Sequence, residues 1–480
     1  MPAVSTEAPE APRRPDAVHP VTPATPRRPD AVHPVTPAAS PGTVSSTPPR
    51  SLTADSPTPR SATPETTATP EPATPETTAP ASPVPDRRLH PGGPGYRRMS
   101  LALFLAGVAT FALLYATQAL LPLLSDDFHA SASDTSWTVS AATGALALAV
   151  VPLSALSERF GRRTMMTAAL CVAVPLALLA PFAPTLGSLI ALRAVQGAAL
   201  AALPASAMAY LAEEVRPKAL VAAIGLFVAG NSVGGMSGRV LTGWVAQGWG
   251  WRAAVGAVAV LALGCALAFR ALLPAPRHFA PVPLAPRALV RTVRGHLANP
   301  LLLRLYAIGG LFMTVFGAVY TVIGYRLSAP PLALPQGLVG SVFLVYLVGT
   351  GSSAAAGRLV RRAGRRGALY LAAGTTAAGL LVSLGGPLWC VLPGLVLVTA
   401  GFFAGHAVAS SSVSDTARTG RAQASALYQS AYYLGSSVGG TLGASAYHAA
   451  GWSGTVLLGL LAVVGVVGVV LVGTVTARRA

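Results

Sequence analysis

Two arginines lie inside long apolar stretches of this 480-residue sequence. Arg193 is followed three residues later by Gln196, and Arg239 ends a glycine-rich stretch. Where such a stretch crosses a bilayer, an arginine costs about 2.5 to 3.5 kcal/mol on insertion scales unless it meets water or a partner. Each is therefore a candidate to contact a substrate or a coupling ion. The alternatives are a structural pairing of Arg193 with Gln196, backbone carbonyls or an acid, and snorkelling of Arg239 to the outer interface.

A compact group of charges joins two other apolar stretches. It follows Ser154 and comprises Glu158, Arg159, Gly161, Arg162 and Arg163. A small residue lets two helix ends approach, a carboxylate stabilises a neighbouring helix N-terminus, and arginines hold a turn at the anionic cytoplasmic leaflet. The group is therefore a candidate conformational switch. A plain basic loop on the inner side of the membrane is the alternative.

Three landmarks occur twice at nearly the same spacing, which predicts an internal repeat. Gly-Arg-Arg at 161–163 returns at 364–366, and Gly-Trp at 250–251 returns at 451–452. Between them, Gly-x-Ser-Val-Gly-Gly at 230–235 returns at 435–440. The sequence therefore consists of two similar halves.

Glycines recur at every fourth position around the last of these landmarks. They are Gly230, Gly234 and Gly238 in the first copy and Gly435, Gly439 and Gly443 in the second. On a helix this spacing makes a face without side chains, against which another backbone packs closely. A static contact and a seam that moves during function are both compatible with it.

The composition places the chain among membrane proteins. Hydrophobic residues make up 52% of the sequence and charged residues only 10%, and the mean hydropathy is +0.57. The net charge of +18 does not indicate nucleic-acid binding, because the arginines lie in short connections without interleaved aromatics. No nucleophile–base pair, metal-ligand spacing or Walker A loop is present in the sequence, so we expect neither an enzyme nor a cofactor.

Twelve largely apolar runs are long enough to cross a hydrocarbon core of about 30 Å. They lie near 100–123, 136–156, 164–183, 186–211, 219–244, 252–273, 303–326, 336–357, 368–386, 389–412, 421–448 and 453–475. Arginines occupy every alternate connection, which places those connections and both termini in the cytoplasm. All six tryptophans fall on the outer side, where an indole N–H stays wet. We therefore predict an all-α, multi-pass protein of the plasma membrane.

The predicted domains follow from this pattern. Residues 1–98 form a disordered tail rich in Pro, Thr and Ala, because such a segment buries too little apolar area to offset its conformational entropy. The N-terminal half spans 99–273 and the C-terminal half spans 303–480, each with six helices. A cytoplasmic linker at 274–302 joins them. Nothing in the pattern requires an oligomer.

The charged group at 154–163 resembles the signature between helices 2 and 3 of the major facilitator superfamily. Ser154 stands for the glycine of that signature and Glu158 for its aspartate. Arg193 and Gln196 with the following glycine are similar to the superfamily's helix 4 pattern. On helix 5, Asn231 replaces the proline of the antiporter motif, which is a departure from it.

A narrower resemblance is to the acriflavine-sensitivity branch of bacterial drug–proton antiporters. It rests on residues 230–239, on Tyr115 and Gln118 of helix 1, and on Tyr432 and Tyr433 of helix 11. These side chains are therefore candidates for contact with a substrate or a coupling ion. The resemblance covers essentially everything after residue 98.

The resemblance implies alternating access to a midplane site between the two halves. It implies a role of Arg193 in proton coupling, and it places Glu158 near the N-terminus of helix 11, around Arg421 to Ser425, when the cytoplasmic side is closed. We expect proton-driven export of a small molecule, either a drug or a metabolite. No Asp or Glu lies in the middle of a predicted helix, although His406, with an ordinary pKa near 6.5, could carry a proton. Uptake or exchange of a metabolite and a non-transporting membrane sensor or scaffold are the alternatives.

Overall fold

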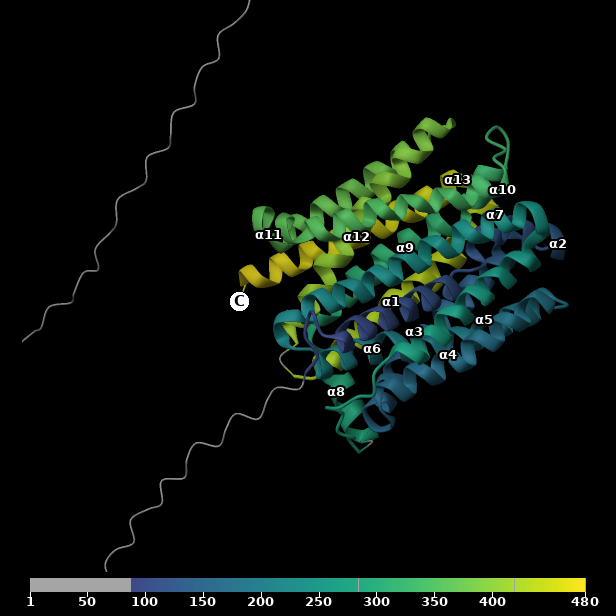
Figure 1. Cartoon of the computed structure of the whole chain (residues 1–480). Coiled ribbons are helices and arrows are strands. Elements are labelled where there is room, and N and C mark those ends of the chain that lie inside the picture. Colours follow the sequence, from purple (N-terminus) through teal and green to yellow (C-terminus); the bar gives the residue numbers. More distant parts are fainter. Residues whose placement is uncertain (1–87, 284, 418, 480) are drawn as a thin grey trace, which may run out of the picture. The chain divides into compact units, whose positions relative to one another are not determined.

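The computed structural model describes residues 88–283, 285–417 and 419–479, which are almost entirely helical (Figure 1). The α-helices are α1 (Pro94–Leu114), α2 (Leu121–Phe128), α3 (Ala132–Phe160), α4 (Arg162–Leu179), α5 (Leu186–Leu200), α6 (Ala202–Glu214), α7 (Pro217–Leu272), α8 (Pro286–Ala298), α9 (Pro300–Ser328), α10 (Gln336–Ser341), α11 (Tyr346–Val382), α12 (Leu388–Thr416) and α13 (Arg421–Arg479). Short 3₁₀ turns lie at Gln118–Leu120, Ala180–Phe182 and Val342–Val345. The predicted all-α fold is confirmed.

Local sequence explains where several helices begin. Helices α1, α7, α8 and α9 each start at a proline, in the first turn, where a backbone N–H has no helical partner. The N-terminus of α3 has a capping box in which Ser131 and Asp134 satisfy each other's backbone N–H groups. Thr185 and Ser188 do the same for α5.

Among the described residues, nine helical stretches are long and apolar enough to cross a membrane. Three of them contain a sharp break at a glycine in the left-handed region of backbone space. These are α7 at Gly250 (φ 76°), α11 at Gly364 (φ 68°) and α13 at Gly451 (φ 60°). A side chain with a Cβ rarely adopts this conformation, so glycine is needed there. Each break separates two helical segments, which accounts for the difference between nine stretches and twelve predicted spans.

The internal repeat of the sequence recurs in the packing of the helices. In the N-terminal half α1 packs against α7, and in the C-terminal half α9 packs against α13. Gly234 lies against the backbone of Val108, and Gly439 lies against the backbone of Thr314; a Cβ at either glycine would overlap a carbonyl oxygen. Both glycine rows therefore form close helix–helix seams. The halves meet mainly where α3 packs against α13 and where α7 packs against α10.

The boundary predicted for the tail is wrong for its last residues. Residues 1–87 lie outside the described part of the chain, but 88–98 are ordered. Leu89 pairs with Val215 in a short parallel bridge, with Leu89 N–H donating to Glu214 O at 2.7 Å and Arg216 N–H donating to Leu89 O at 3.1 Å. Helix α1 then begins at Pro94. Backbone pairing with the loop after α6 orders this polar segment, which composition alone does not reveal.

The predicted contact of the indole N–H groups with water is wrong for two of the six tryptophans. Trp137, Trp244, Trp249 and Trp389 are exposed, but only 4% of Trp251 and 6% of Trp452 is accessible. Both buried rings directly follow a glycine that breaks a helix, and the sharp turn directs them into the bundle. The Trp452 N–H donates to Ser383 Oγ at 3.2 Å and is not wet.

Candidate functional site

The first apolar stretch is broken near its middle, and Arg193 binds at the break. Helix α1 ends at Leu114. The N–H of Gln118, which would bind Leu114 O in a continuous helix, donates instead to Tyr115 O at 3.0 Å. Leu114 O therefore lacks its helical partner. The buried Arg193 guanidinium donates to Leu113 O (2.6 Å) and to Leu114 O, and its Nε donates to Thr138 O at 3.1 Å. Arg193 therefore supplies the N–H groups that the broken helix lacks.

Gln196 completes this arrangement. Its Oε1 accepts from Arg193, and its Nε2 donates to Ala173 O at 2.9 Å. The pairing with Gln196 and backbone carbonyls that was one alternative for Arg193 is thus present in the structure. It stabilises the irregular segment between α1 and α2.

Arg239 lies between the two halves and does not snorkel to the interface, because only 2% of it is accessible. Its Nε and Nη2 donate to Gln118 Oε1 at 2.8 and 2.6 Å, and its Nη1 donates to Gly235 O. Its Cζ lies 4.3 Å from the ring centre of Tyr115, 4.8 Å from that of Phe343 and 5.0 Å from that of Tyr346. One ring comes from the N-terminal half and two from the C-terminal half, so the cation joins the halves.

Neither buried arginine forms an ion pair with a carboxylate of the described residues. Carbonyl groups, amide groups and, for Arg239, ring faces balance these charges instead. The hydroxyl of Tyr346, a residue that is 8% accessible, has no hydrogen-bond partner within the described residues. One buried hydroxyl beside Arg239 therefore lacks a hydrogen-bond partner among the described residues.

Aromatic rings lead from Arg239 towards the other end of the bundle. Phe316 lies 5.2 Å from Tyr346 and 4.0 Å from Phe402, measured between ring centres. His406 follows at 6.0 Å from Phe402 and 4.7 Å from Tyr432, which in turn contacts Tyr433 at 5.1 Å. The rings form a continuous apolar wall, and both predicted tyrosines of helix 11 belong to it.

A cavity of about 540 Å³ lies beyond this wall, between the two halves. Helix ends next to the arginine-rich connections line it, so it belongs to the arginine-rich end of the bundle, which the sequence predicts to be cytoplasmic. The N-terminal half contributes Ser154, Ser157, Glu158, Arg162, Ala205, Met208, Ala209 and Ala212. The C-terminal half contributes His406, Ser410, Ser411, Val413, Ser414, Arg421, Ala422, Ser425, Ala426, Tyr428 and Gln429.

Several lining hydroxyls already donate their hydrogen to their own helix. Ser154 donates to Val151 O at 2.7 Å, Ser157 to Ser154 O at 2.7 Å, Ser410 to Ala407 O at 3.3 Å, and Ser411 to Val408 O at 3.1 Å. These side chains therefore present lone pairs to the cavity. Gln429 also lines the cavity, and its Oε1 is buried without a partner among the described residues.

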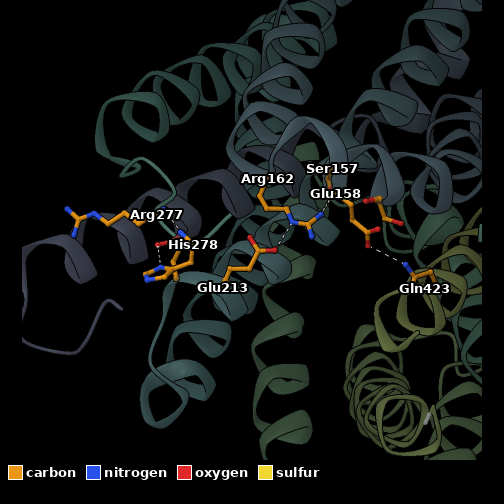
Figure 2. A network of polar contacts seen from close by, with 9 residues as sticks. Ser157, Glu158, Arg162, Glu213, Arg277, His278 and Gln423 are labelled. Carbon is orange, nitrogen blue, oxygen red and sulfur yellow. Dashed lines mark hydrogen bonds and ion pairs between the residues drawn. The ribbon is translucent and has the colours of Figure 1, made fainter. Parts of the chain in front are cut away.

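Two of the predicted switch residues, Glu158 and Arg162, line this cavity, and Figure 2 shows their polar contacts. Gln423, in the first turn of α13, donates through its side-chain amide to Glu158 Oε1 at 3.3 Å. Arg162 donates to Glu213 Oε1 at 3.1 Å and to Ser157 Oγ at 2.7 Å. Glu158 thus contacts the first turn of α13, the segment that the resemblance gives as its neighbour when the cytoplasmic side is closed, and this contact joins the two halves.

The second copy of the charged group repeats part of this geometry. Arg365, the counterpart of Arg162, binds the carboxylate of Asp415 at the end of α12, as Arg162 binds Glu213 at the end of α6. Gly161, with φ 92°, makes the turn between α3 and α4, as Gly364 does within α11.

The remaining predicted residues have different surroundings. Arg159 is exposed and lies over the Phe160 ring at 5.8 Å, and Arg163 is half-buried in the first turn of α4. Asn231 packs against Gly107 of α1, and its Oδ1 is buried without a partner among the described residues. The structure therefore does not bring Asn231 into the cavity.

Sequence reasoning missed a second acid at this end. Only 2% of Glu214 is accessible, and its Oε1 accepts the backbone N–H groups of Arg277 and His278 at 2.7 and 2.8 Å. Its Oε2 lies 3.1 Å from His278 Nδ1. Farther along, Val282 N–H donates to Glu158 O at 3.0 Å. The start of the linker is thus fixed to the N-terminal half. In the sequence, the two adjacent acids Glu213 and Glu214 at the end of an apolar run were the signal that could have indicated this contact.

Comparison with known proteins identifies the family. The model described as Major Facilitator Superfamily matches residues 103–440. The chain belongs to the major facilitator superfamily. It is a multi-pass membrane transporter and not an enzyme.

Two relatives within the superfamily cover most of the chain. The inner membrane transport protein YnfM of Escherichia coli (strain K12) is 39% identical over 396 residues, which are 82% of this chain and 94% of YnfM. The MFS-type transporter YybF of Bacillus subtilis (strain 168) is 37% identical over 368 residues, which are 77% of this chain and 91% of YybF.

Two solved transporter structures share the fold. A bacterial homologue of the human lysosomal transporter Spinster has a TM-score of 0.62 at 15% identity and covers 79% of this chain and 95% of its own. The nucleoside transporter NupG has a TM-score of 0.63 at 11% identity and covers 78% of this chain and 99% of its own. The predicted superfamily fold is therefore confirmed.

Proposed function

We propose that this protein is a secondary active transporter that exports a small molecule from the cytoplasm in exchange for protons. The observation that carries the proposal is the cavity between the halves at the arginine-rich end. Its volume of about 540 Å³ lies within the range of about 300 to 1,000 Å³ that is typical of small-molecule sites. A cargo molecule from the cytoplasm would enter the cavity at this end of the bundle.

Contacts between the halves close the tryptophan-rich end, opposite the cavity. Gln336 Nε2 donates to Ala119 O at 2.6 Å, and the Trp244 N–H donates to Ser341 Oγ at 2.9 Å. Together with the ring contacts of Arg239, they separate the cavity from the outer side. Alternating access requires these contacts to break while those around Glu158 form or tighten.

His406 is the group in the cavity wall best suited to carry a proton. Its Nδ1 lies 3.0 Å from the Tyr428 hydroxyl, and the residue lines the cavity. An imidazole ring can both accept and donate a proton, and the cavity would connect this ring to the cytoplasm. Sequence reasoning placed His406 near the inner end of its helix, whereas it lies ten residues before the end of α12 at Thr416.

Metabolite exchange without protons is the second candidate. The observation that favours it is that no carboxylate of the described residues pairs with Arg193 or Arg239, since proton exchange in the membrane commonly uses an acid.

Flux measurements on the purified protein in liposomes separate these functions. Ligands are first selected by thermal shift, and a pH-sensitive dye is enclosed in the vesicles. Proton antiport predicts a change of internal pH when a selected ligand is added to one side, and His406→Gln should reduce this change while Tyr428→Phe retains most of it. Ligand flux without a pH change would establish exchange, and no flux of any selected ligand would favour a sensor or scaffold.

A further inference from the structure

The linker between the halves contains an amphipathic helix, α8, that the domain prediction did not include. With 3.6 residues per turn, Arg287, Arg291 and Arg294 lie in one stripe along the helix. Val290 and Leu297, seven residues apart, form an apolar stripe directly beside it. The helix contains no acidic residue.

Both stripes face away from the protein. Val290 is 56% accessible and Leu297 is 44% accessible, and the three arginines are exposed. No hydrogen bond or ion pair joins these arginine side chains to another described residue. The opposite face of α8 carries the buried His296 and packs against α9 and α13.

Two attachments fix the orientation of the linker. His296 Nε2 lies 3.2 Å from Gly420 O, just before α13, and Val282 N–H donates to Glu158 O at 3.0 Å, at the end of α3. At its other end, α8 stops at Ala298, and the membrane-spanning α9 starts at Pro300 with Asn299 as its N-cap. The exposed stripes therefore lie where a helix enters the membrane.

We propose that α8 lies on the cytoplasmic surface of the membrane and that its exposed stripes bind anionic phospholipid. Val290 and Leu297 would enter the boundary between headgroups and acyl chains, and the three arginines would contact the phosphates. The charge complementarity is specific, since the stripe is purely cationic and the inner leaflet is anionic. Each arginine near such a surface strengthens binding by about fivefold.

The test uses the full chain in nanodiscs of phosphatidylcholine alone or mixed with phosphatidylglycerol. An environment-sensitive fluorophore is attached to Val290→Cys in a background lacking Cys171, Cys265 and Cys390. We expect quenching by spin-labelled lipid to be strong with phosphatidylglycerol, weaker in phosphatidylcholine alone, and reduced by salt. The triple variant R287Q/R291Q/R294Q should lose the dependence on phosphatidylglycerol.

The matched control removes three exposed arginines from another connection at the same end, in R358Q/R361Q/R362Q. This variant should retain the dependence on phosphatidylglycerol. Equal quenching in the two lipid compositions, or an equal dependence on phosphatidylglycerol in the α8 triple variant, would overturn the proposal. If the triple variant fails to insert, the salt dependence of quenching in the protein with its natural arginines decides instead: quenching that salt does not reduce would overturn the proposal.

Discussion

Replacement of Arg239 by glutamine should open the tryptophan-rich end of the transporter. The amide of glutamine can still bind Gln118, but it has no charge to attract the rings of Phe343 and Tyr346, which lie 4.8 and 5.0 Å from Arg239 Cζ in the other half. A cation–π contact contributes about 0.5 to 1 kcal/mol when exposed and about 2 kcal/mol when desolvated. Loss of both contacts therefore removes about 1 to 4 kcal/mol from the closed arrangement.

The shift in population follows from this energy. A change of about 2 kcal/mol moves a two-state equilibrium roughly thirtyfold towards the form in which the rings and residue 239 are separated. A cysteine at Ser140, which is 1% accessible and whose Oγ has no partner among the described residues, reports the change, because the serine is substituted without loss of a hydrogen bond. A membrane-impermeant thiol reagent added outside should label it much faster in Arg239→Gln.

Two controls define the cause. Arg239→Lys keeps the charge and should shift the labelling rate less, although it loses the forked hydrogen bonds to Gln118. Arg252→Gln removes an exposed arginine at the same end whose carboxylate partner, Asp127, belongs to its own half, and it should leave labelling unchanged. If Arg239→Gln labels at the original rate while retaining its thermal stability, the rings do not hold the halves together and the reasoning is wrong.

Three further substitutions or deletions test other features. Gly234→Leu should abolish flux and lower the melting temperature, because overpacking at a backbone contact costs about 1 to 3 kcal/mol. Val233→Leu, on the exposed side of the same helix, should do neither. Equal tolerance of the two substitutions would contradict the close seam. Glu158→Gln should slow flux and speed labelling of Ser411→Cys in the cavity without loss of thermal stability; reduced flux with unchanged labelling would assign the acid to proton or substrate chemistry. Deletion of residues 2–87 should leave membrane insertion and flux intact. Deletion of residues 2–93 should lower the melting temperature, because it also removes the bridge between Leu89 and Val215. Failure of the protein without residues 2–87 to insert would refute the first expectation.

Sequence alone predicted the features that are encoded by periodicity. Glycine at every fourth position directly specifies where a backbone approaches closely, and the structure has a seam at each row. Apolar length specifies spans, and the repeat of Gly161 at Gly364 marks two turns that both require a positive φ. These signals are local, so they could be read without knowledge of packing.

Features that depend on contacts between distant segments could not be predicted. Arg193 binds the carbonyls of a break in α1 that hydropathy does not show, although Pro122 just beyond it is a signal. The rings around Arg239 come from both halves, and nothing near Arg239 in the sequence points to Phe343. Helix α8 could have been recognised from its arginines at spacings of four and three, since that pattern lies within the linker itself.

The back-bonded serines of the cavity have a consequence for selectivity. Because Ser410 and Ser411 have already directed their hydrogens to Ala407 O and Val408 O, the wall that they form accepts hydrogen bonds but does not offer them. A cargo molecule that contacts these two serines must therefore supply the donor group of the hydrogen bond. Methylation of a single N–H or O–H on a cargo molecule would therefore replace a donated hydrogen bond with a methyl group and leave a serine lone pair without a partner.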